Sequence, residues 1–85
     1  MAYSLQYKRS VEKDLARLDK REAKRILDRI EKELATQPDR YPALQGRFAG
    51  LRKMRSGDYR VIYSIDDQDH ELTVLGVGHR REVYR

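Results

Sequence analysis

The sequence predicts an α+β fold in which an N-terminal strand and a helical hairpin precede a three-stranded antiparallel meander. The supporting observations are apolar residues at helical spacing between residues 11 and 34, apolar and polar residues in alternation after residue 50, and turn residues between the alternating runs. Hydrophobic residues make up 39% of the 85 residues, which suffices for one layer of helices on one sheet. We therefore expect a single domain over residues 1–85, a four-stranded sheet with the helices on one face, and an open second face.

The N-terminal residues are expected to form a strand and a short helix. Alternation with polar residues predicts a half-buried strand for Tyr3, Leu5 and Tyr7. Ser10 is the expected cap of the first helix, because its hydroxyl can accept a hydrogen bond from a free backbone N–H. The apolar face of this helix contains Val11, Leu15 and Leu18.

The second helix should begin after Asp19, since Asp19 with Glu22 three residues later fits a capping box. Pro38 should stop this helix, and residues 38–50 are expected to form an irregular connection. Its apolar stripe consists of Ala23, Ile26, Leu27, Ile30 and Leu34.

The alternating runs that follow predict three antiparallel strands at 51–55, 59–66 and 71–77. Residues 56–58 and 66–70 supply the two turns. Within the middle strand, Tyr59, Val61, Tyr63 and Ile65 share one face, which we expect to be the core face.

The net charge of +5 is concentrated in two segments. Residues 44–60 carry an excess of four positive charges and residues 76–85 an excess of two, whereas the segment between them has an excess of four negative charges. Such a distribution suits a polyanion, and phosphodiesters are the obvious candidate. The candidate contacts are Arg52, Lys53, Arg55, Arg60, His79, Arg80 and Arg81.

Other chemistries have little support in the composition. The absence of cysteine excludes disulfides, a thiolate nucleophile and a cysteine-ligated zinc site. Carboxylates cluster only at Asp66, Asp67 and Asp69, where a solvated turn is the favoured interpretation and a loose metal site the alternative. We expect no cofactor. The sequence has no signal-peptide core and no apolar run of about 20 residues, so we expect a cytoplasmic protein without membrane contact.

Arg60 is the first candidate for chemistry. RNA can be cleaved without a metal when a 2′-hydroxyl attacks its own phosphate, and a guanidinium group can stabilise the charge that develops. The alternative is a structural ion pair between Arg60 and Asp58 or Glu71. Alternation places Lys53 and Arg55 together on one strand face and Arg52 on the other.

Two candidates near the C-terminus could move protons. Histidine is the side chain type that ordinarily changes charge near neutral pH, so His79 suits a general acid, and the alternative is a phosphate contact. Tyr84 could orient a 2′-hydroxyl or stack on a base, and the alternative is that it seals the sheet edge.

The run Tyr59-Arg60-Val61-Ile62-Tyr63, followed by Gly78-His79-Arg80 and then Tyr84, resembles the RelE branch of the RelE/ParE toxin superfamily. The resemblance implies that Arg60 and Arg80 hold the scissile phosphate, that Lys53 supports charge in the transition state, and that Tyr84 acts on the 2′-hydroxyl. Arg52, Arg55, His79 and Arg81 are the expected RNA contacts, and His79 departs from the family pattern because other members carry lysine there. Leu51 stands where such proteins often carry a second lysine, which is a departure from the pattern.

The resemblance implies an mRNA endoribonuclease of a type II toxin-antitoxin system, acting in the ribosomal A site and leaving a 2′,3′-cyclic phosphate and a 5′-hydroxyl. Its expected partners are a cognate RelB-like antitoxin, mRNA and the ribosome. One alternative is a ParE-like toxin that inhibits DNA gyrase, although such toxins lack the combined set of Lys53, Arg60, Arg80 and Tyr84. A non-catalytic nucleic-acid-binding module is the other alternative.

Overall fold

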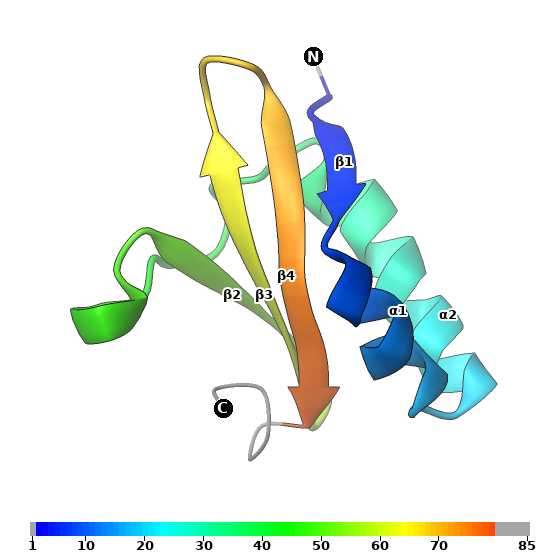
Figure 1. Cartoon of the computed structure of the whole chain (residues 1–85). Coiled ribbons are helices and arrows are strands. Elements are labelled where there is room, and N and C mark those ends of the chain that lie inside the picture. The colour runs from blue at the N-terminus through cyan, green and yellow to red at the C-terminus, as the bar shows by residue number, and fades with distance from the viewer. Residues whose placement is uncertain (1, 80–85) are drawn as a thin grey trace.

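The computed structural model describes residues 2–79, so Arg80, Arg81 and Tyr84 lie outside the described residues (Figure 1). A π-helical segment, Ile30–Leu34, continues the second helix, and a short 3₁₀ turn, Gly46–Phe48, precedes the second strand. In chain order the main elements are β1 (Ser4–Tyr7), α1 (Arg9–Ala16), α2 (Lys20–Arg29), β2 (Leu51–Ser56), β3 (Tyr59–Asp66) and β4 (Glu71–His79).

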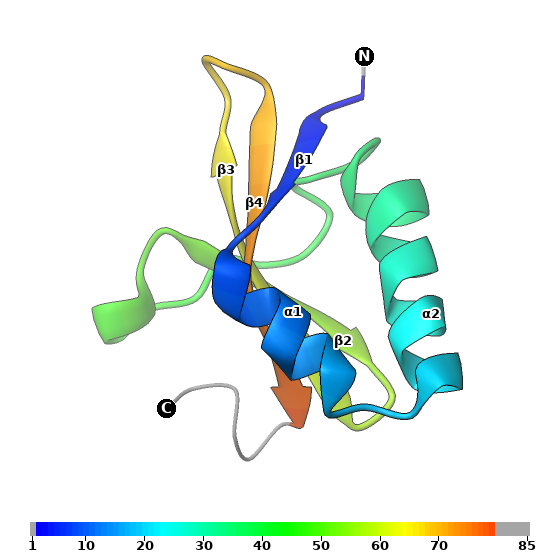
Figure 2. The same cartoon turned by 45° about the vertical axis from the view of Figure 1, so that its right-hand side comes forward.

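The four strands form one mixed sheet in the order β1-β4-β3-β2. β2, β3 and β4 are an antiparallel meander, whereas β1 pairs with β4 in parallel. Both helices lie on the same side of the sheet (Figure 2). The predicted α+β class and the order of its elements are confirmed. No helix within residues 2–79 is long and apolar enough to cross a membrane.

The core fills the space between the helices and one face of the sheet. Val61 and Tyr63 are fully buried at its centre, and Tyr59 and Ile65 pack against it, as the alternation in β3 predicts. The remaining buried members come from α1, α2, the π-helical segment, β2 and β4: Val11, Ile26, Ile30, Leu34, Met54, Leu72, Val74 and Val77.

The two helix starts differ from each other. Asp19 caps α2 as predicted, because its carboxylate accepts a hydrogen bond from the backbone N–H of Arg21 at 2.8 Å. The prediction that Ser10 caps α1 is wrong, since α1 begins at Arg9 and its N-cap is Lys8. The N–H of Lys8 donates to the carbonyl oxygen of Val74 at 2.9 Å. Strand pairing therefore continues up to the first helical residue, which leaves Ser10 inside the first turn.

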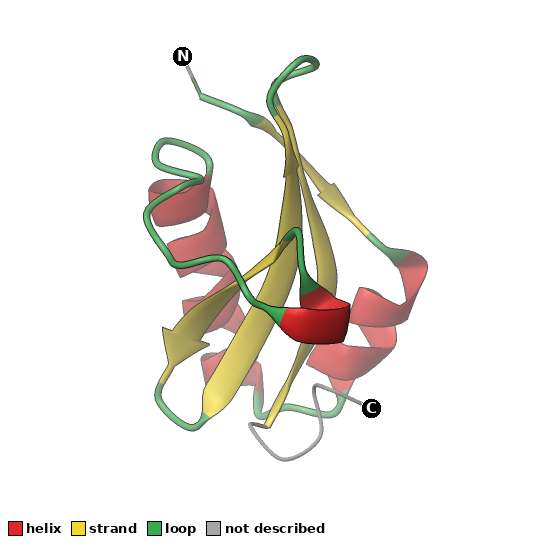
Figure 3. Ribbon diagram, turned by 90° about the vertical axis from the view of Figure 1, so that its left-hand side faces the viewer, coloured by secondary structure: helices red, strands yellow, loops and turns green. Residues whose placement is uncertain are grey.

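A long connection joins the helical segment to β2 (Figure 3) and pairs with the outer edge of that strand at its first two residues. The buried hydroxyl of Tyr63 donates to the carbonyl oxygen of Pro38 at 2.8 Å and so holds the start of the connection. Farther along, the N–H of Leu44 donates to the carbonyl oxygen of Leu51 at 2.8 Å. A loop in this position satisfies backbone groups that an exposed edge strand would present to other chains.

A β-bulge interrupts the pairing of β3 with β4. Ile62 lies opposite Gly76 and Tyr63 lies opposite Val74, so Leu75 has no partner in β3. The extra residue reverses which residues of β4 face the core: Leu72 and Val74 face it before the bulge, and Val77 faces it afterwards. β4 also extends to His79, two residues beyond the predicted end.

The buried hydroxyl of Tyr63 gives a test of this core. Burial raises the pKa of this hydroxyl to about 12, in keeping with its place in the core. Tyr63→Phe should lower the free energy of unfolding by about 1–2 kcal/mol, because the Pro38 carbonyl loses its donor in a buried site. Urea denaturation measures the change. Tyr7→Phe is the control, since Tyr7 is an exposed tyrosine, and equal effects of the two changes would contradict the assignment.

Candidate active site

Three cationic side chains lie together on the face of the sheet opposite the helices. Lys53 and Arg55 belong to β2, and Arg60 belongs to β3. Pairing places Arg55 directly opposite Arg60 and Lys53 directly opposite Ile62, and directly opposed residues project from the same face. We call these three residues the cationic strip. The prediction that alternation would bring Lys53 and Arg55 to one face is thus confirmed, and Arg60 joins them.

The pairing of Arg55 with Arg60 is unfavourable for the fold, because like charges directly opposite each other in a sheet repel. Both guanidinium groups donate to the carbonyl oxygen of Gly57 at 3.4 Å, and Arg60 also donates to that of Tyr59 at 3.1 Å. Within residues 2–79, no carboxylate lies at ion-pair distance from either arginine. The alternative ion pair of Arg60 with Asp58 or Glu71 is therefore not observed there. Within the described residues, neither charge is neutralised by a carboxylate.

Arg52 lies apart from the cationic strip, on the core-side face opposite Tyr63. Its guanidinium group donates to the carbonyl oxygens of Tyr41 and Asp39, so it holds the connection that covers β2. These contacts give Arg52 a structural part in the loop. Its predicted role in RNA binding is not tested by them.

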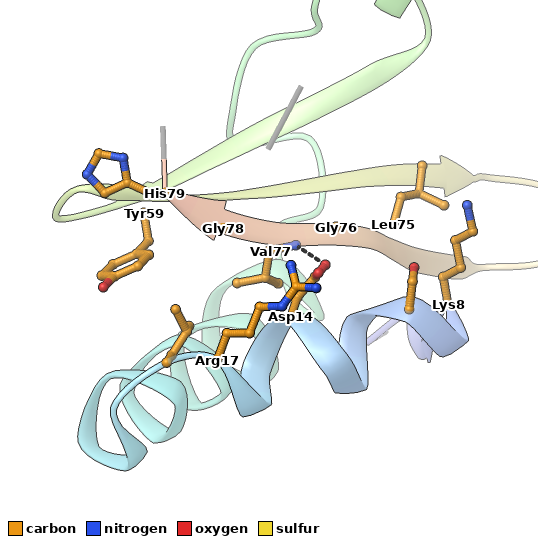
Figure 4. A pocket seen from close by; sticks show the side chains of 11 residues that line it. Lys8, Asp14, Arg17, Tyr59, Leu75, Gly76, Val77, Gly78 and His79 are labelled. Carbon is orange, nitrogen blue, oxygen red and sulfur yellow. Dashed lines mark hydrogen bonds between the residues drawn. The ribbon is translucent and has the colours of Figure 1, made fainter. Parts of the chain in front are cut away.

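His79 ends β4 and lies opposite Tyr59, with the ring centroids 6.0 Å apart and the rings nearly perpendicular at 84°. Both residues border a groove of about 470 Å³ between α1 and the last residues of β4 (Figure 4). Lys8 and Arg17 also line this groove. Because His79 lies opposite Tyr59, its side chain projects from the core-side face beside α1, whereas Arg60 projects from the opposite face with the cationic strip. Strand pairing therefore does not bring His79 to the strip.

Asp14 is a polar residue of this region that the sequence analysis missed. Its Oδ2 atom accepts a hydrogen bond from the backbone N–H of Val77 at 3.1 Å (Figure 4). β1 pairs with residues 71–74 of β4 only. Beyond that point, Asp14 of α1 provides a hydrogen-bond acceptor for the edge of β4. A signal was present in the sequence, because Asp14 interrupts the apolar face formed by Val11 and Leu18.

A second missed cluster joins α2, the connection and β2. Arg29 binds both carboxylate oxygens of Glu33, from Nε at 2.6 Å and from an amino group at 3.3 Å. It also donates to the Tyr41 hydroxyl at 2.9 Å and to the carbonyl oxygen of Arg55 at 2.6 Å. Tyr41 and Arg40 contact the same carboxylate at 2.8 and 3.2 Å. The sequence signal was an arginine and a glutamate four residues apart.

The hydrogen bonds from Arg29, aided by Tyr41 and nearby Arg40, lower the pKa of Glu33 to about 2. The carboxylate is therefore charged over the whole physiological range. Arg29 and Glu33 thus form an ion pair beside β2, and Arg40 adds a second positive charge to the same carboxylate.

Carboxylates of the acidic turn accept hydrogen bonds from within the turn and from Tyr3. The Asp66 carboxylate accepts from the N–H groups of Gln68 and Asp69 at 3.1 and 3.2 Å, and Asp67 accepts from the Tyr3 hydroxyl at 2.6 Å. These bonds fit the solvated-turn interpretation. In the described part of the chain, no three His, Asp or Glu side chains form a group that could hold a metal ion.

The fold and its match to known proteins define a small toxin of the RelE/ParE superfamily. Residues 5–84 match the family described as "ParE toxin of type II toxin-antitoxin system, parDE". The chain belongs to this superfamily of type II toxin-antitoxin toxins. The predicted resemblance is therefore confirmed.

Among characterised relatives, the chain is similar to Toxin RelG of Mycobacterium tuberculosis, with 30% identity over 86 residues that span 100% of this chain and 99% of RelG. Toxin RelE of the same organism is 34% identical over 74 residues, covering 86% of this chain and 76% of RelE. These relatives place the chain in the RelE family.

Solved structures agree with this assignment. The toxin-antitoxin complex RelBE2 from Mycobacterium tuberculosis contains a chain that matches with a TM-score of 0.89 and 28% identity, over 94% of this chain and 100% of that one. A chain of the archaeal RelE-RelB complex from Pyrococcus horikoshii matches with a TM-score of 0.71 and 31% identity, over 98% and 100% of the two chains.

The repulsion within the cationic strip predicts a stabilising substitution. Arg55→Thr should raise the free energy of unfolding by about 0.5 kcal/mol, because it removes one of two opposed like charges. The gain should shrink as salt is added to the urea titration, since salt screens exposed charges. Arg52→Thr is the control and should destabilise, because it breaks bonds to the connection. A lower free energy of unfolding in Arg55→Thr would show that repulsion between Arg55 and Arg60 does not destabilise the fold.

The low pKa of Glu33 predicts how stability depends on pH. A carboxylate with a lowered pKa stabilises the fold fully above its ordinary pKa, and this contribution disappears as pH falls toward about 2. Wild type should therefore be more stable than Glu33→Gln at pH 6, and the difference should fade between about pH 4.5 and 2. Thermal unfolding followed by circular dichroism provides the measurement. A difference that is constant with pH would refute this role.

Proposed function

We propose that this toxin is an endoribonuclease that cleaves mRNA in the ribosomal A site without a metal ion. The observation that carries the proposal is the cationic strip, in which Arg55 and Arg60 oppose each other despite their repulsion. Such an arrangement is unfavourable in the free protein and favourable once a phosphodiester lies between the two groups. The similarity to proteins named RelE and RelG also supports this proposal.

The proposed reaction begins with attack of a 2′-hydroxyl oxygen on the adjacent phosphorus. The 2′-oxygen loses its proton, the bond from phosphorus to the 5′-oxygen breaks, and the leaving oxygen takes up a proton. The products are a 2′,3′-cyclic phosphate and a 5′-hydroxyl. Arg60 and Lys53 would stabilise the negative charge that accumulates on the phosphorane oxygens, since both project from one sheet face.

The proton transfers are assigned to residues near the C-terminus. Tyr84 would take or orient the 2′-hydroxyl proton, and Arg80 would hold the phosphate from the side opposite Arg60. His79 is proposed as the general acid for the leaving oxygen; because strand pairing places it on the face opposite the cationic strip, this role would require the RNA to pass around the end of β4. Arg81 would bind the RNA backbone together with Arg55.

The ribosome would position the substrate. The cationic strip lies on a sheet face, so it offers charge but few walls to hold a flexible single strand in an attacking geometry. An mRNA already ordered in the A site would remove that entropic barrier. We further propose a cognate RelB-like antitoxin as the partner that blocks the strip, because similar toxins are found in RelBE and RelE-RelB complexes.

Inhibition of DNA gyrase is the second candidate function, because the matching family is described by the name ParE. The non-catalytic module has less support. Base stacking would require accessible rings, but Tyr63 is fully buried with its hydroxyl bonded to Pro38, and Tyr59 packs against the core.

One experiment separates these candidates. Purified protein is incubated with programmed ribosomes, with naked mRNA and with gyrase plus supercoiled DNA, and the RNA ends are mapped chemically. We expect cleavage on ribosomes with 5′-hydroxyl ends and no effect on gyrase. Gyrase inhibition without RNA cleavage would favour the ParE-like function, and binding without either effect would favour the module.

Arg60→Ala should reduce cleavage on programmed ribosomes by about 100- to 1,000-fold, because it removes one group that stabilises the transition-state charge. The fold should persist, since Arg60 donates only to carbonyls of its own turn among the described residues. Arg25→Ala is the control for the loss of one positive charge, as Arg25 is exposed on α2. Cleavage by Arg60→Ala at the wild-type rate would remove Arg60 from the site.

A further inference from the structure

We propose that Arg29 is a positioning residue that holds Arg55 in place on the cationic strip, through its hydrogen bond to the carbonyl oxygen of Arg55. The inference rests on the proposed function and extends it to a residue on the other side of the sheet. Arg29 would not touch the RNA. It would act through Arg55 alone.

The contacts of Arg29 join three separate parts of the chain. Its guanidinium group donates to the Arg55 carbonyl at 2.6 Å, to Glu33 at 2.6 and 3.3 Å, and to the Tyr41 hydroxyl at 2.9 Å. α2, the connection and β2 thus meet at one planar group. A guanidinium group bound in several directions is rigid, and rigid support is what a precisely placed charge needs.

The position of β2 makes such support necessary. β2 is an edge strand, so β3 pairs with it on one side only. On its outer side, the carbonyl oxygen of Leu51 accepts from Leu44 at 2.8 Å, and the carbonyl oxygen of Arg55 accepts from Arg29. Arg60 repels Arg55 across the hairpin, and the bond from Arg29 holds the outer side of β2 at the residue where that repulsion acts.

A direct electrostatic role for Arg29 is poorly supported by its surroundings. Glu33 binds it through both carboxylate oxygens, so the pair presents little net charge to an approaching RNA. If Arg29 attracted RNA by charge, a lysine would serve equally well. If it positions Arg55, a lysine should fail, because an ammonium group cannot reproduce a planar fork that binds a carboxylate, a hydroxyl and a carbonyl together.

The test is a double-mutant cycle on programmed ribosomes. Arg29→Lys should lower the single-turnover cleavage rate at subsaturating toxin by about tenfold, because the charge at position 29 is kept and only the placement of Arg55, a contact to the RNA backbone, is lost. In an Arg55→Ala background the same substitution should have no further effect, since its target is gone. Arg25→Lys on the same helix is the matched control and should cleave like wild type.

Circular dichroism distinguishes positioning from simple unfolding. Rates are compared only at temperatures where each variant is fully folded. A tenfold loss in both the wild-type and the Arg55→Ala backgrounds would assign Arg29 a general structural role and overturn the inference. Cleavage by Arg29→Lys at the wild-type rate would also overturn the inference.

The outcome for the unmodified protein keeps the two proposals apart. If wild type cleaves and Arg29→Lys cleaves equally well, only the role of Arg29 falls. If wild type cleaves no RNA on ribosomes, the proposed function falls and the inference falls with it.

Discussion

Burial of Val61 and Tyr63 beneath the helices is the constraint on which the functional face depends. Side chains alternate along a strand, so burial of these two residues commits Arg60 to the opposite face, where pairing sets it against Arg55. A slip of one residue would bury the arginine. The magnitudes explain why the arrangement persists: one buried apolar side chain contributes roughly 1.5–3 kcal/mol, whereas opposed like charges oppose folding by roughly 0.2–1 kcal/mol. The apolar layer therefore tolerates a repulsive surface on its other side.

Local periodicity explains how much of the fold could be predicted from the sequence. The helical stripes and the alternating runs depend on near neighbours, so the class, the element order and both hairpin turns could be derived from them. The parallel pairing of β1 with β4 joins residues 4–7 to residues 71–74, and no local pattern encodes a contact over that distance. The failed cap at Ser10 has the same origin, because a bond between Lys8 and Val74 occupies the entry to α1.

For the site as for the fold, the features that depend on a single strand could be predicted and the contacts between distant segments could not. Alternation was enough to place Lys53 and Arg55 together, because it is a property of a single strand. Asp14 and Arg29 were missed, because each binds a backbone group of a distant strand and backbone partners leave no trace in residue types. The roles of Arg80, Arg81 and Tyr84 remain predictions, since they lie outside residues 2–79.

The bulge at Leu75 shifts the alternation of core-facing and outward-facing side chains in β4 by one residue. Even-numbered residues reach the core before it and odd-numbered residues after it, so Gly78 shares a face with Arg60 and His79 lies across from Tyr59. A substitution in this stretch does not change which positions of β4 face the core. Removing or adding a single residue between Val74 and Val77 would exchange the two faces for everything that follows. Evolution of this strand should therefore proceed by substitution at fixed length, while changes in length accumulate in the turn at residues 67–70.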